Sequence, residues 1–414
     1  VAYSGNTGGS GGPHLHFEVR RGGADDLHTH STIINPLRFG LPYTDNIKPT
    51  IRGLRIYPLQ GTPVTVGKEN SVTVGGPFYL GIYATDAAEG STARNGVDRI
   101  EVYLDGTLFF LYTTESIPVD SSRMDNALID YRHYSAHRQA YLLTRALPGA
   151  EGPWIPVRTG DGIFRLDAGS THRISVKVFD IKENSTERTF TVHVTAPSCA
   201  TRSTVANTVP ASYDKPFTHQ AEAFRIGMKA LTLYADDELE LSATHTTPYR
   251  VPAVTVRPTL NDIPPHQAYT LSLKAQAPLG VTPDKVTVVR LDGNRNIAYP
   301  TSHSSGWYTA QVRDFGRFTL ATDTVAPTVK PLNFVEGRPL KSQTLKVKIG
   351  DNLSGIDTYN CHLNGEWILA EYDGKTAALV IDARGKLKAG QNELRVDVTD
   401  ACGNRSLKRY ILTK

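Results

Sequence analysis

The stretch Ile100-Glu101-Val102-Tyr103-Leu104-Asp105-Gly106 decides the fold class of this 414-residue chain. Its residues alternate in character, which places Ile100, Val102 and Leu104 on one face of an extended strand. Asp-Gly is among the strongest short signals for a two-residue hairpin turn. The stretch therefore predicts a half-buried antiparallel strand that reverses direction at Asp105-Gly106.

The same pattern occurs again near the C-terminus, where Leu363-Asn364-Gly365 predicts an equivalent hairpin. The two copies begin at Thr44-Asp45 and Thr322-Asp323. Further features follow in the same order in the two copies. The first copy has Asp86, then Gly96-Val97-Asp98, then Asp180 with Asn184. The second copy has Asp351, then Gly355-Ile356-Asp357, then Asp400 with Asn404. We infer one domain type used twice.

Short alternating strands with turn signals between them are typical of immunoglobulin-like β-sandwiches. We therefore expect an all-β protein. The expected parts are a short β-sheet segment at 1–43, an immunoglobulin-like sandwich with an insertion at 44–198, a β-sandwich at 199–322 and an immunoglobulin-like sandwich at 323–414. In the middle region, four segments alternate like strands: Leu231–Leu233, Tyr269–Leu273, Val286–Val288 and Phe318–Leu320.

The insertion in the first copy runs from about Thr113 to Phe164. Within it, 137–147 has weak helical character. Residues 131–134 together with His137 form a polar, aromatic patch. This patch is either a contact for glycan or peptide, or a surface excursion that packs a tyrosine over the sandwich.

The N-terminal stretch Pro13-His14-Leu15-His16-Phe17-Glu18 follows a glycine-rich run and also alternates. An extended conformation would place His14, His16 and Glu18 on one face and anchor the apolar residues on the other. Neutral imidazole is a good zinc ligand, and catalytic zinc sites often combine histidine with a carboxylate. The stretch predicts part of a zinc site.

Residues 5–20 resemble the last catalytic motif of the lysostaphin/LytM-type zinc endopeptidases, which cut peptide cross-links in bacterial peptidoglycan. The main departure is Gly11, where that family usually has Thr. Ile34-Asn35-Pro36-Leu37 further resembles the Asn-Pro segment that closes the family's catalytic domain. The resemblance implies that residues 1–43 are the C-terminal remnant of a truncated peptidase domain of this type.

The resemblance implies that His16 is a zinc ligand and that His14 acts beside the metal-bound water, as general base or transition-state stabiliser. Glu18 is either an orienting partner of an imidazole or a solvated side chain. The family's other two ligands come from an upstream His-x-x-x-Asp motif, which does not occur in this sequence. We therefore expect the chain to be the C-terminal part of a longer protein and to be inactive by itself.

Two function classes follow. The first is a Zn²⁺-dependent endopeptidase acting on the stem peptides or cross-bridges of peptidoglycan, in the periplasm, cell envelope or extracellular space of a bacterium. The second is a non-catalytic envelope scaffold or binding protein that retains a degenerate peptidase domain. In either case an envelope protein partner is possible, and an intact upstream His-x-x-x-Asp would distinguish the two classes.

Composition sets further limits. With 21% charged and 39% hydrophobic residues and no apolar run near 18, the sequence predicts no transmembrane segment. A net charge of +4 without a basic stripe predicts no nucleic-acid partner. Cys361 and Cys402 fall in one expected domain and either pair or stay free, while Cys199 has no evident partner. The sequence 351–355 lacks the spaced acidic ligands of an EF-hand loop and is interpreted as a turn.

Overall fold

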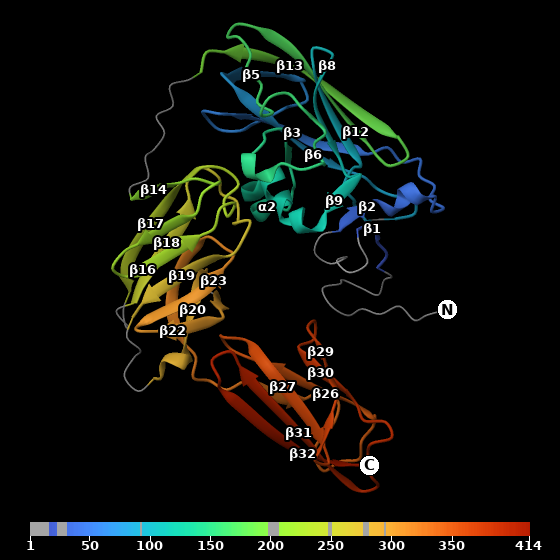
Figure 1. The fold of residues 1–414 in the computed structure, drawn as a ribbon. Coiled ribbons are helices and arrows are strands. Elements are labelled where there is room, and N and C mark those ends of the chain that lie inside the picture. The colour runs from blue at the N-terminus through green and yellow to red at the C-terminus, as the bar shows by residue number, and fades with distance from the viewer. Residues whose placement is uncertain are drawn as a thin grey trace.

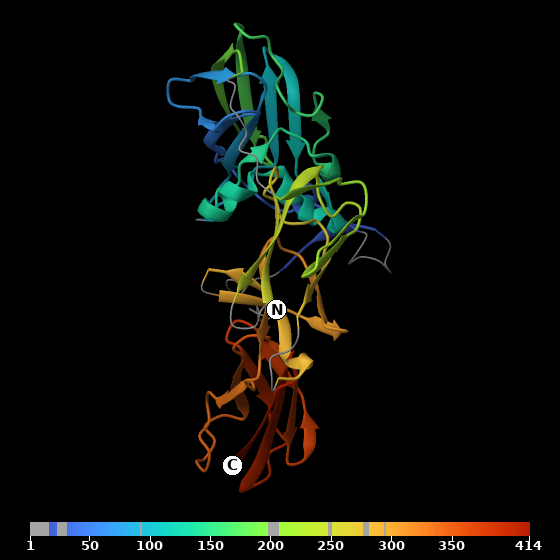
Figure 2. The ribbon, with the colours of Figure 1, turned by 90° about the vertical axis from the view of Figure 1, so that its left-hand side faces the viewer.

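The computed structural model describes residues 16–22, 31–91, 93–197, 207–246, 251–275, 281–293 and 295–414. The predicted all-β class is confirmed, because nearly all regular structure is strand. Three β-sandwiches follow one another along the molecule (Figures 1 and 2). Each has its own apolar core, formed within 54–194, 211–320 and 329–412.

The first sandwich packs a four-stranded sheet against a six-stranded one. The first sheet has the order β10-β6-β3-β4 (Leu142–Leu143, Phe78–Thr85, Thr50–Pro58 and Val64–Thr65). The second has the order β11-β8-β7-β12-β13-β5 (Val157–Arg158, Thr107–Thr113, Arg99–Leu104, Thr171–Phe179, Ser185–Thr195 and Ser71–Gly75). Phe78, Phe110 and Phe190 fill the space between the sheets and are at most 1% exposed.

The last sandwich repeats this plan with fewer strands. One sheet has the order β25-β26-β30-β29 (Thr328–Pro331, Thr344–Gly350, Ala378–Asp382 and Ala370–Asp373). The other has the order β28-β27-β31-β32 (Glu366–Ile368, Ile356–Leu363, Gln391–Asp400 and Arg405–Thr413). The order β28-β27-β31-β32 matches β8-β7-β12-β13 of the first sandwich, so these two sheets share the order of four strands.

The two predicted hairpins are present at the expected residues. Asp105 and Gly106 connect β7 to β8 with φ values of 48° and 86°, and Asn364 and Gly365 connect β27 to β28 with φ values of 54° and 86°. Two consecutive positive φ angles are the signature of a type I′ turn, whose twist matches that of the flanking strands. Local sequence therefore fixed these two turns.

The middle sandwich has sheets of six and five strands. Their orders are β14-β17-β18-β24-β20-β21 (Thr208–Ala211, Asp237–Thr246, Val251–Pro258, Gly316–Thr322, Val286–Asp292 and Arg295–Tyr299) and β15-β16-β19-β23-β22 (Phe217–Gln220, Phe224–Met228, Tyr269–Lys274, Trp307–Val312 and Thr301–Ser304). Three of the four predicted strands are confirmed in β19, β20 and β24. The prediction for Leu231–Leu233 is wrong, because this segment is a turn in which Leu231 has a φ of 61°.

The insertion of the first sandwich contains β9 (Ser116–Pro118), α1 (Asp125–Leu128) and α2 (Tyr131–His137), with short 3₁₀ turns at Val119–Met124 and Pro148–Ala150. The helix predicted at 137–147 is found earlier in the chain, as α2 at Tyr131–His137. Asp130 accepts a hydrogen bond from the backbone of His133 and caps the N-terminus of α2, and Arg138 ends the helix in the left-handed conformation.

The insertion also docks against the middle sandwich, where Figure 1 shows α2 beside the upper strands. Tyr234 packs into a small apolar cluster with Ala127, Leu147 and Ala150. Its hydroxyl donates to the carbonyl of Arg123 at 2.8 Å, and its own carbonyl accepts from the backbone of Gly149 at 2.7 Å. The first two sandwiches therefore share a packed interface.

Of the two alternatives left open for Cys361 and Cys402, the structure has the unpaired one: both thiols are free and buried. Cys361 lies in the middle of β27 opposite Val396, whereas Cys402 follows the end of β31 at Asp400. The four residue steps of strand from Val396 to Asp400 span about 13 Å, which exceeds the Cα separation that a disulfide bridges. Cys199 lies outside the described residues.

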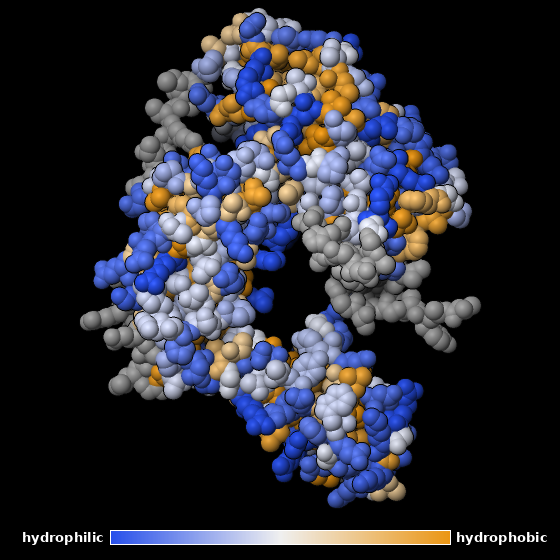
Figure 3. Space-filling view, in the orientation of Figure 1, coloured by the Kyte–Doolittle hydropathy of each residue, from blue (hydrophilic) through white to orange (hydrophobic). Residues whose placement is uncertain are grey.

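Among the described helices, none has the length and apolar character that a bilayer crossing requires. The face drawn in Figure 3 carries hydrophilic residues over most of the three sandwiches, with hydrophobic residues in separate patches.

Candidate functional site

His16 is the one predicted site residue that the structure describes, since His14 lies outside the described residues. The strand predicted for this stretch starts later than expected: β1 is Val19–Arg21, and residues 16–18 precede it without regular structure. The His16 side chain is 72% exposed, and its Nε2 lies 2.6 Å from Oε1 of Glu18. Nδ1 is then the ring nitrogen that could hold a metal.

Glu18 connects the imidazole to a guanidinium. Its Oε2 accepts a hydrogen bond from Nε of Arg20 at 2.5 Å, and the two side chains form an ion pair in which Nη2 of Arg20 lies 2.5 Å from the same oxygen. These bonds, followed by the one to His16, lower the pKa of Glu18. The carboxylate therefore stays ionised and fixes the orientation of the His16 ring, which is the usual arrangement behind a metal-bound histidine.

The expectation that Phe17 would anchor an apolar face is wrong, because its side chain is 58% exposed. β1 belongs to a sheet of only three strands, β1-β2-β9, with β2 at Thr32–Ile34. This small sheet gives Phe17 no packing layer among the described residues. Within the same residues, no group of three potential metal ligands includes His16.

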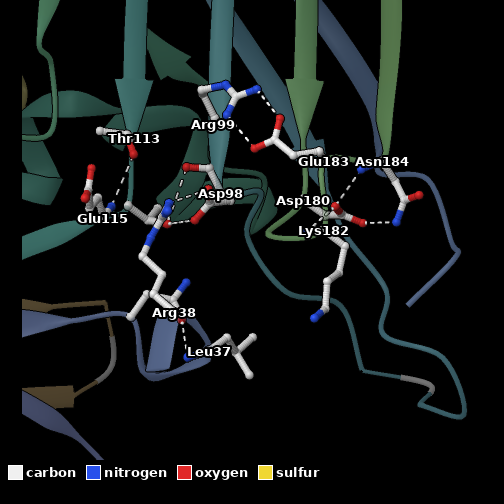
Figure 4. Close-up of polar contacts among 12 residues, drawn as sticks. Leu37, Arg38, Asp98, Arg99, Thr113, Glu115, Asp180, Lys182, Glu183 and Asn184 are labelled. Carbon is white, nitrogen blue, oxygen red and sulfur yellow. Dashed lines mark hydrogen bonds and ion pairs between the residues drawn. The ribbon is translucent and has the colours of Figure 1, made fainter. Parts of the chain in front are cut away.

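The segment that carries His16 is fixed to the first sandwich at two places. β2 pairs with β9 of the insertion, so the three-stranded sheet joins residues of the N-terminal segment to the sandwich. Arg38, in the 3₁₀ turn Pro36–Phe39, donates to the buried carboxylate of Asp98 at 2.9 Å (Figure 4). Asn35 begins that turn by accepting a hydrogen bond from the backbone of Leu37 at 3.1 Å.

A second kind of polar site was missed by the sequence analysis. Asp45, Asp86 and Asp180 gather in the first sandwich with carboxylate oxygens within 4.8 Å of one another, and all three are buried. Asp323, Asp351 and Asp400 form the same group in the last sandwich. We call these groups the first and the second Asp cluster. Their signal in the sequence was the repetition of three aspartates at matched positions in the two copies.

Both clusters are built by the same hydrogen bonds. Asp180 accepts from the backbone of Lys182 and Asn184, and its second oxygen accepts from the Asn184 side chain at 2.7 Å (Figure 4). In the second cluster, Asp400 accepts from the backbone of Cys402 and Asn404 and from the Asn404 side chain at 2.8 Å.

The third residue differs in its setting between the clusters: Asp86 follows β6 and pairs with Asn95 in an isolated antiparallel bridge, whereas Asp351 lies in a turn. Asp351 accepts from the backbone of Leu353 and Gly355 at 2.9 Å, which confirms the predicted turn at 351–355. Burial is the largest cause that raises the pKa of Asp86, and the carboxylates of Asp180 and Asp45 raise it further. The three carboxylates therefore concentrate negative charge at one buried place, and the raised pKa of Asp86 reflects that burial and that charge.

The comparisons with known proteins assign only part of the chain. A family described as a Zu5-like domain matches residues 208–323, which is the middle sandwich and the residue after it. No curated protein matches the sequence. Neither result bears on residues 5–20.

Several solved structures match the chain at low similarity. A mixed-linkage glucan utilization protein of Bacteroides ovatus, SGBP-B, is 10% identical over 89% of this chain and 71% of its own, with a TM-score of 0.18. A bacterial ice-binding adhesin is 12% identical over 90% of this chain and 99% of its own, with a TM-score of 0.15. The fibronectin-III array of a RIM-binding protein is 11% identical over 90% of this chain and 100% of its own, with a TM-score of 0.16. TM-scores this low carry no argument about function.

Proposed function

We propose that this chain is part of a Zn²⁺-dependent endopeptidase that hydrolyses the peptide cross-links of bacterial peptidoglycan. The observation that carries the proposal is the stretch 5–20, whose resemblance to the lysostaphin/LytM-type motif extends from the glycine run through Pro13-His14-Leu15-His16. The contact between His16 and Glu18 supports it, because a carboxylate on one ring nitrogen leaves the other to bind a metal.

Each residue has a separate task in this proposal. His16 would hold the zinc ion through Nδ1, and Glu18 would keep the ring oriented and raise its basicity. When bound, zinc lowers the pKa of a coordinated water and polarises the scissile carbonyl. His14 would move a proton at the attacking oxygen or stabilise the negative charge that develops on the carbonyl oxygen.

The proposal requires ligands beyond His16. A catalytic zinc site has three protein ligands, and the resemblance assigns the other two to a His-x-x-x-Asp motif that this sequence does not contain. The 414-residue chain by itself is therefore expected to bind zinc weakly and to lack peptidase activity. The three sandwiches would position the enzyme in the periplasm, cell envelope or extracellular space, or bind cell wall or a partner protein.

The experiment compares variants of the full-length protein that contains this chain. His16→Ala should abolish zinc retention, whereas His14→Ala should retain zinc and lose turnover. The matched control is His303→Ala, an exposed histidine of the middle sandwich, which should change neither. If His14→Ala and His16→Ala both hydrolyse purified peptidoglycan normally, the proposal is wrong and the non-catalytic scaffold takes its place.

A further inference from the structure

Asp86 differs from the other carboxylates of the first Asp cluster in what its oxygens contact. It is 8% exposed, and its Oδ1 is buried without a hydrogen-bond partner. An unpartnered buried carboxylate oxygen is costly, so such a group calls for an explanation such as a bound ion. Asp351, at the matched position of the second cluster, is only half-buried as a residue, but its Oδ1 is also buried without a partner.

The neighbouring carboxylates are held in place but keep free lone pairs. Asp45 accepts one bond on each oxygen, from the backbone of Ile47 at 3.0 Å and from the hydroxyl of Tyr43 at 2.7 Å. A carboxylate has about four acceptor positions, so both Asp45 and Asp180 can still bind a cation. No lysine or arginine of the described part of the chain forms an ion pair with these three aspartates. The Lys182 ammonium lies instead over the ring of Tyr43, 5.7 Å from its centroid.

We propose that the first Asp cluster, Asp45, Asp86 and Asp180, binds a Ca²⁺ ion, and that the second Asp cluster binds another in the same way. The donors are all oxygens, which hard cations such as Ca²⁺ prefer. Two oxygens bound to one Ca²⁺ at about 2.4 Å are at most about 4.8 Å apart, and the carboxylate oxygens of each cluster meet that limit. Backbone carbonyls and water would complete the coordination.

The first cluster also has an entrance. Asp86 and Asp180 line a cleft of about 310 Å³ that extends to Asn35, Leu37 and Asp98. An ion can therefore reach the carboxylates from solvent, and the cleft lies where the N-terminal segment meets the first sandwich.

The second cluster has a competing cation nearby. Lys285 of the middle sandwich donates from Nζ to the carbonyl of Cys402 at 2.7 Å, next to Asp400. This positive charge repels an incoming divalent ion, but Lys285 also forms an ion pair with Asp284 at 3.7 Å, which offsets part of that repulsion.

The position of both clusters assigns the ions a structural role. Asp45 and Asp323 lie in the segments that lead into β3 and β25. Asp180 directly follows β12 and Asp400 ends β31, so both lie just before the turn into the last strand of their sandwich. An ion at either cluster ties the entering segment to the far end of its domain, and so fixes how that domain follows the preceding one.

The test measures Ca²⁺ binding by the 414-residue chain after treatment with EDTA. Equilibrium dialysis at about 5 mM Ca²⁺, above the dissociation constants of extracellular calcium modules, should give two ions for the unchanged protein. Asp86→Asn should give one ion, and Asp86→Asn with Asp351→Asn none. Asp292→Asn, at the exposed end of β20 and outside both clusters, is the control and should still give two. No ion in the unchanged protein, or two in the double variant, would overturn the proposal.

A second measurement does not depend on removing a carboxylate. Tb³⁺ in a calcium site emits when a nearby tyrosine is excited, and the Tyr43 hydroxyl contacts Asp45. In an Asp351→Asn background, Tyr43→Phe should lower this emission while the bound Tb³⁺ stays at one ion. Equal emission with and without Tyr43 would place the ion elsewhere and contradict the first site. Neither result depends on the zinc proposal.

Discussion

Asn184 donates a hydrogen bond from its side-chain amide to the backbone carbonyl of Asp45 at 3.0 Å, and so joins the first and last segments of the first sandwich. Asn404 makes the same bond to the carbonyl of Asp323 at 3.0 Å in the last sandwich. Each asparagine also donates to the aspartate four residues before it. The two copies therefore close their sandwiches with the same side chain.

This pair gives the first prediction. Asn184→Ala removes two hydrogen bonds, one of them to a carboxylate, and should lower the free energy of unfolding of the first sandwich by about 1–3 kcal/mol. Hydrogen exchange should become faster in β12 and β13 and stay unchanged in β31 and β32. Asn404→Ala should give the reverse pattern, which makes each variant the control for the other. Uniform acceleration in both sandwiches would contradict this account.

Gly149 lies where the insertion meets the middle sandwich. A Cβ atom there would be 2.9 Å from the carbonyl oxygen of Tyr234 and 3.0 Å from its Cα, both of which belong to the backbone. Gly149→Ala should therefore weaken the interface by about 1–3 kcal/mol, the usual cost of overpacking. Small-angle scattering should show a larger radius of gyration with all three sandwiches still folded. Gly67→Ala, where a Cβ would have open space, should leave the radius unchanged.

The two described thiols should be unreactive in the folded protein. Burial raises the pKa of Cys361 to about 12 and also raises that of Cys402. Because the thiolate is the reactive form, a thiol reagent at pH 8 should modify neither residue in a Cys199→Ser background. Both should react once the protein is unfolded. Rapid modification of Cys361 under native conditions would show that the core of the last sandwich is less closed than described.

Asp382 gives a prediction about pH. Hydrogen bonds from the Arg384 side chain and then from its backbone lower the pKa of Asp382 from 3.8 to about 2. Since the folded-state pKa is depressed, its stabilising effect is fully present above about pH 4 and is lost as the pH falls toward 2. Arg384→Ala should raise the pKa toward 3.8, but only in part, because the backbone bond remains.

Carboxyl NMR titration measures this pKa directly. Lys386→Ala is the control, because Lys386 contributes least to the lowered pKa of Asp382 and its removal should change the titration far less. An unchanged pKa in Arg384→Ala would rule out the guanidinium as the main cause.

The features that the sequence predicted correctly are those that depend on adjacent residues. Asp105-Gly106 and Asn364-Gly365 form their turns because both φ angles are set by the two residues themselves. Leu231 was assigned to a strand on the same local reasoning, and the prediction was wrong because tertiary packing places it in a turn with a positive φ. Local pattern cannot distinguish a three-residue strand from an apolar turn.

The Asp clusters could not be predicted from the sequence for a different reason. Asp45, Asp86 and Asp180 are distant in the sequence and meet only when both sheets of the sandwich are formed. Each of these aspartates, taken by itself, resembles an ordinary turn residue, and Asp351 does occupy a turn. The contact between His16 and Glu18 could be predicted from the sequence, because two residues two positions apart can lie on one side of an extended chain.

The most direct test of the zinc endopeptidase is hydrolysis of purified peptidoglycan by the full-length protein, with the released fragments identified by mass spectrometry. We predict new amino and carboxyl ends within the peptide cross-links, loss of these products on chelation of zinc, and their return when zinc is added. Full-length protein that retains zinc and releases no such fragments, or that releases them equally after complete chelation, would contradict the account.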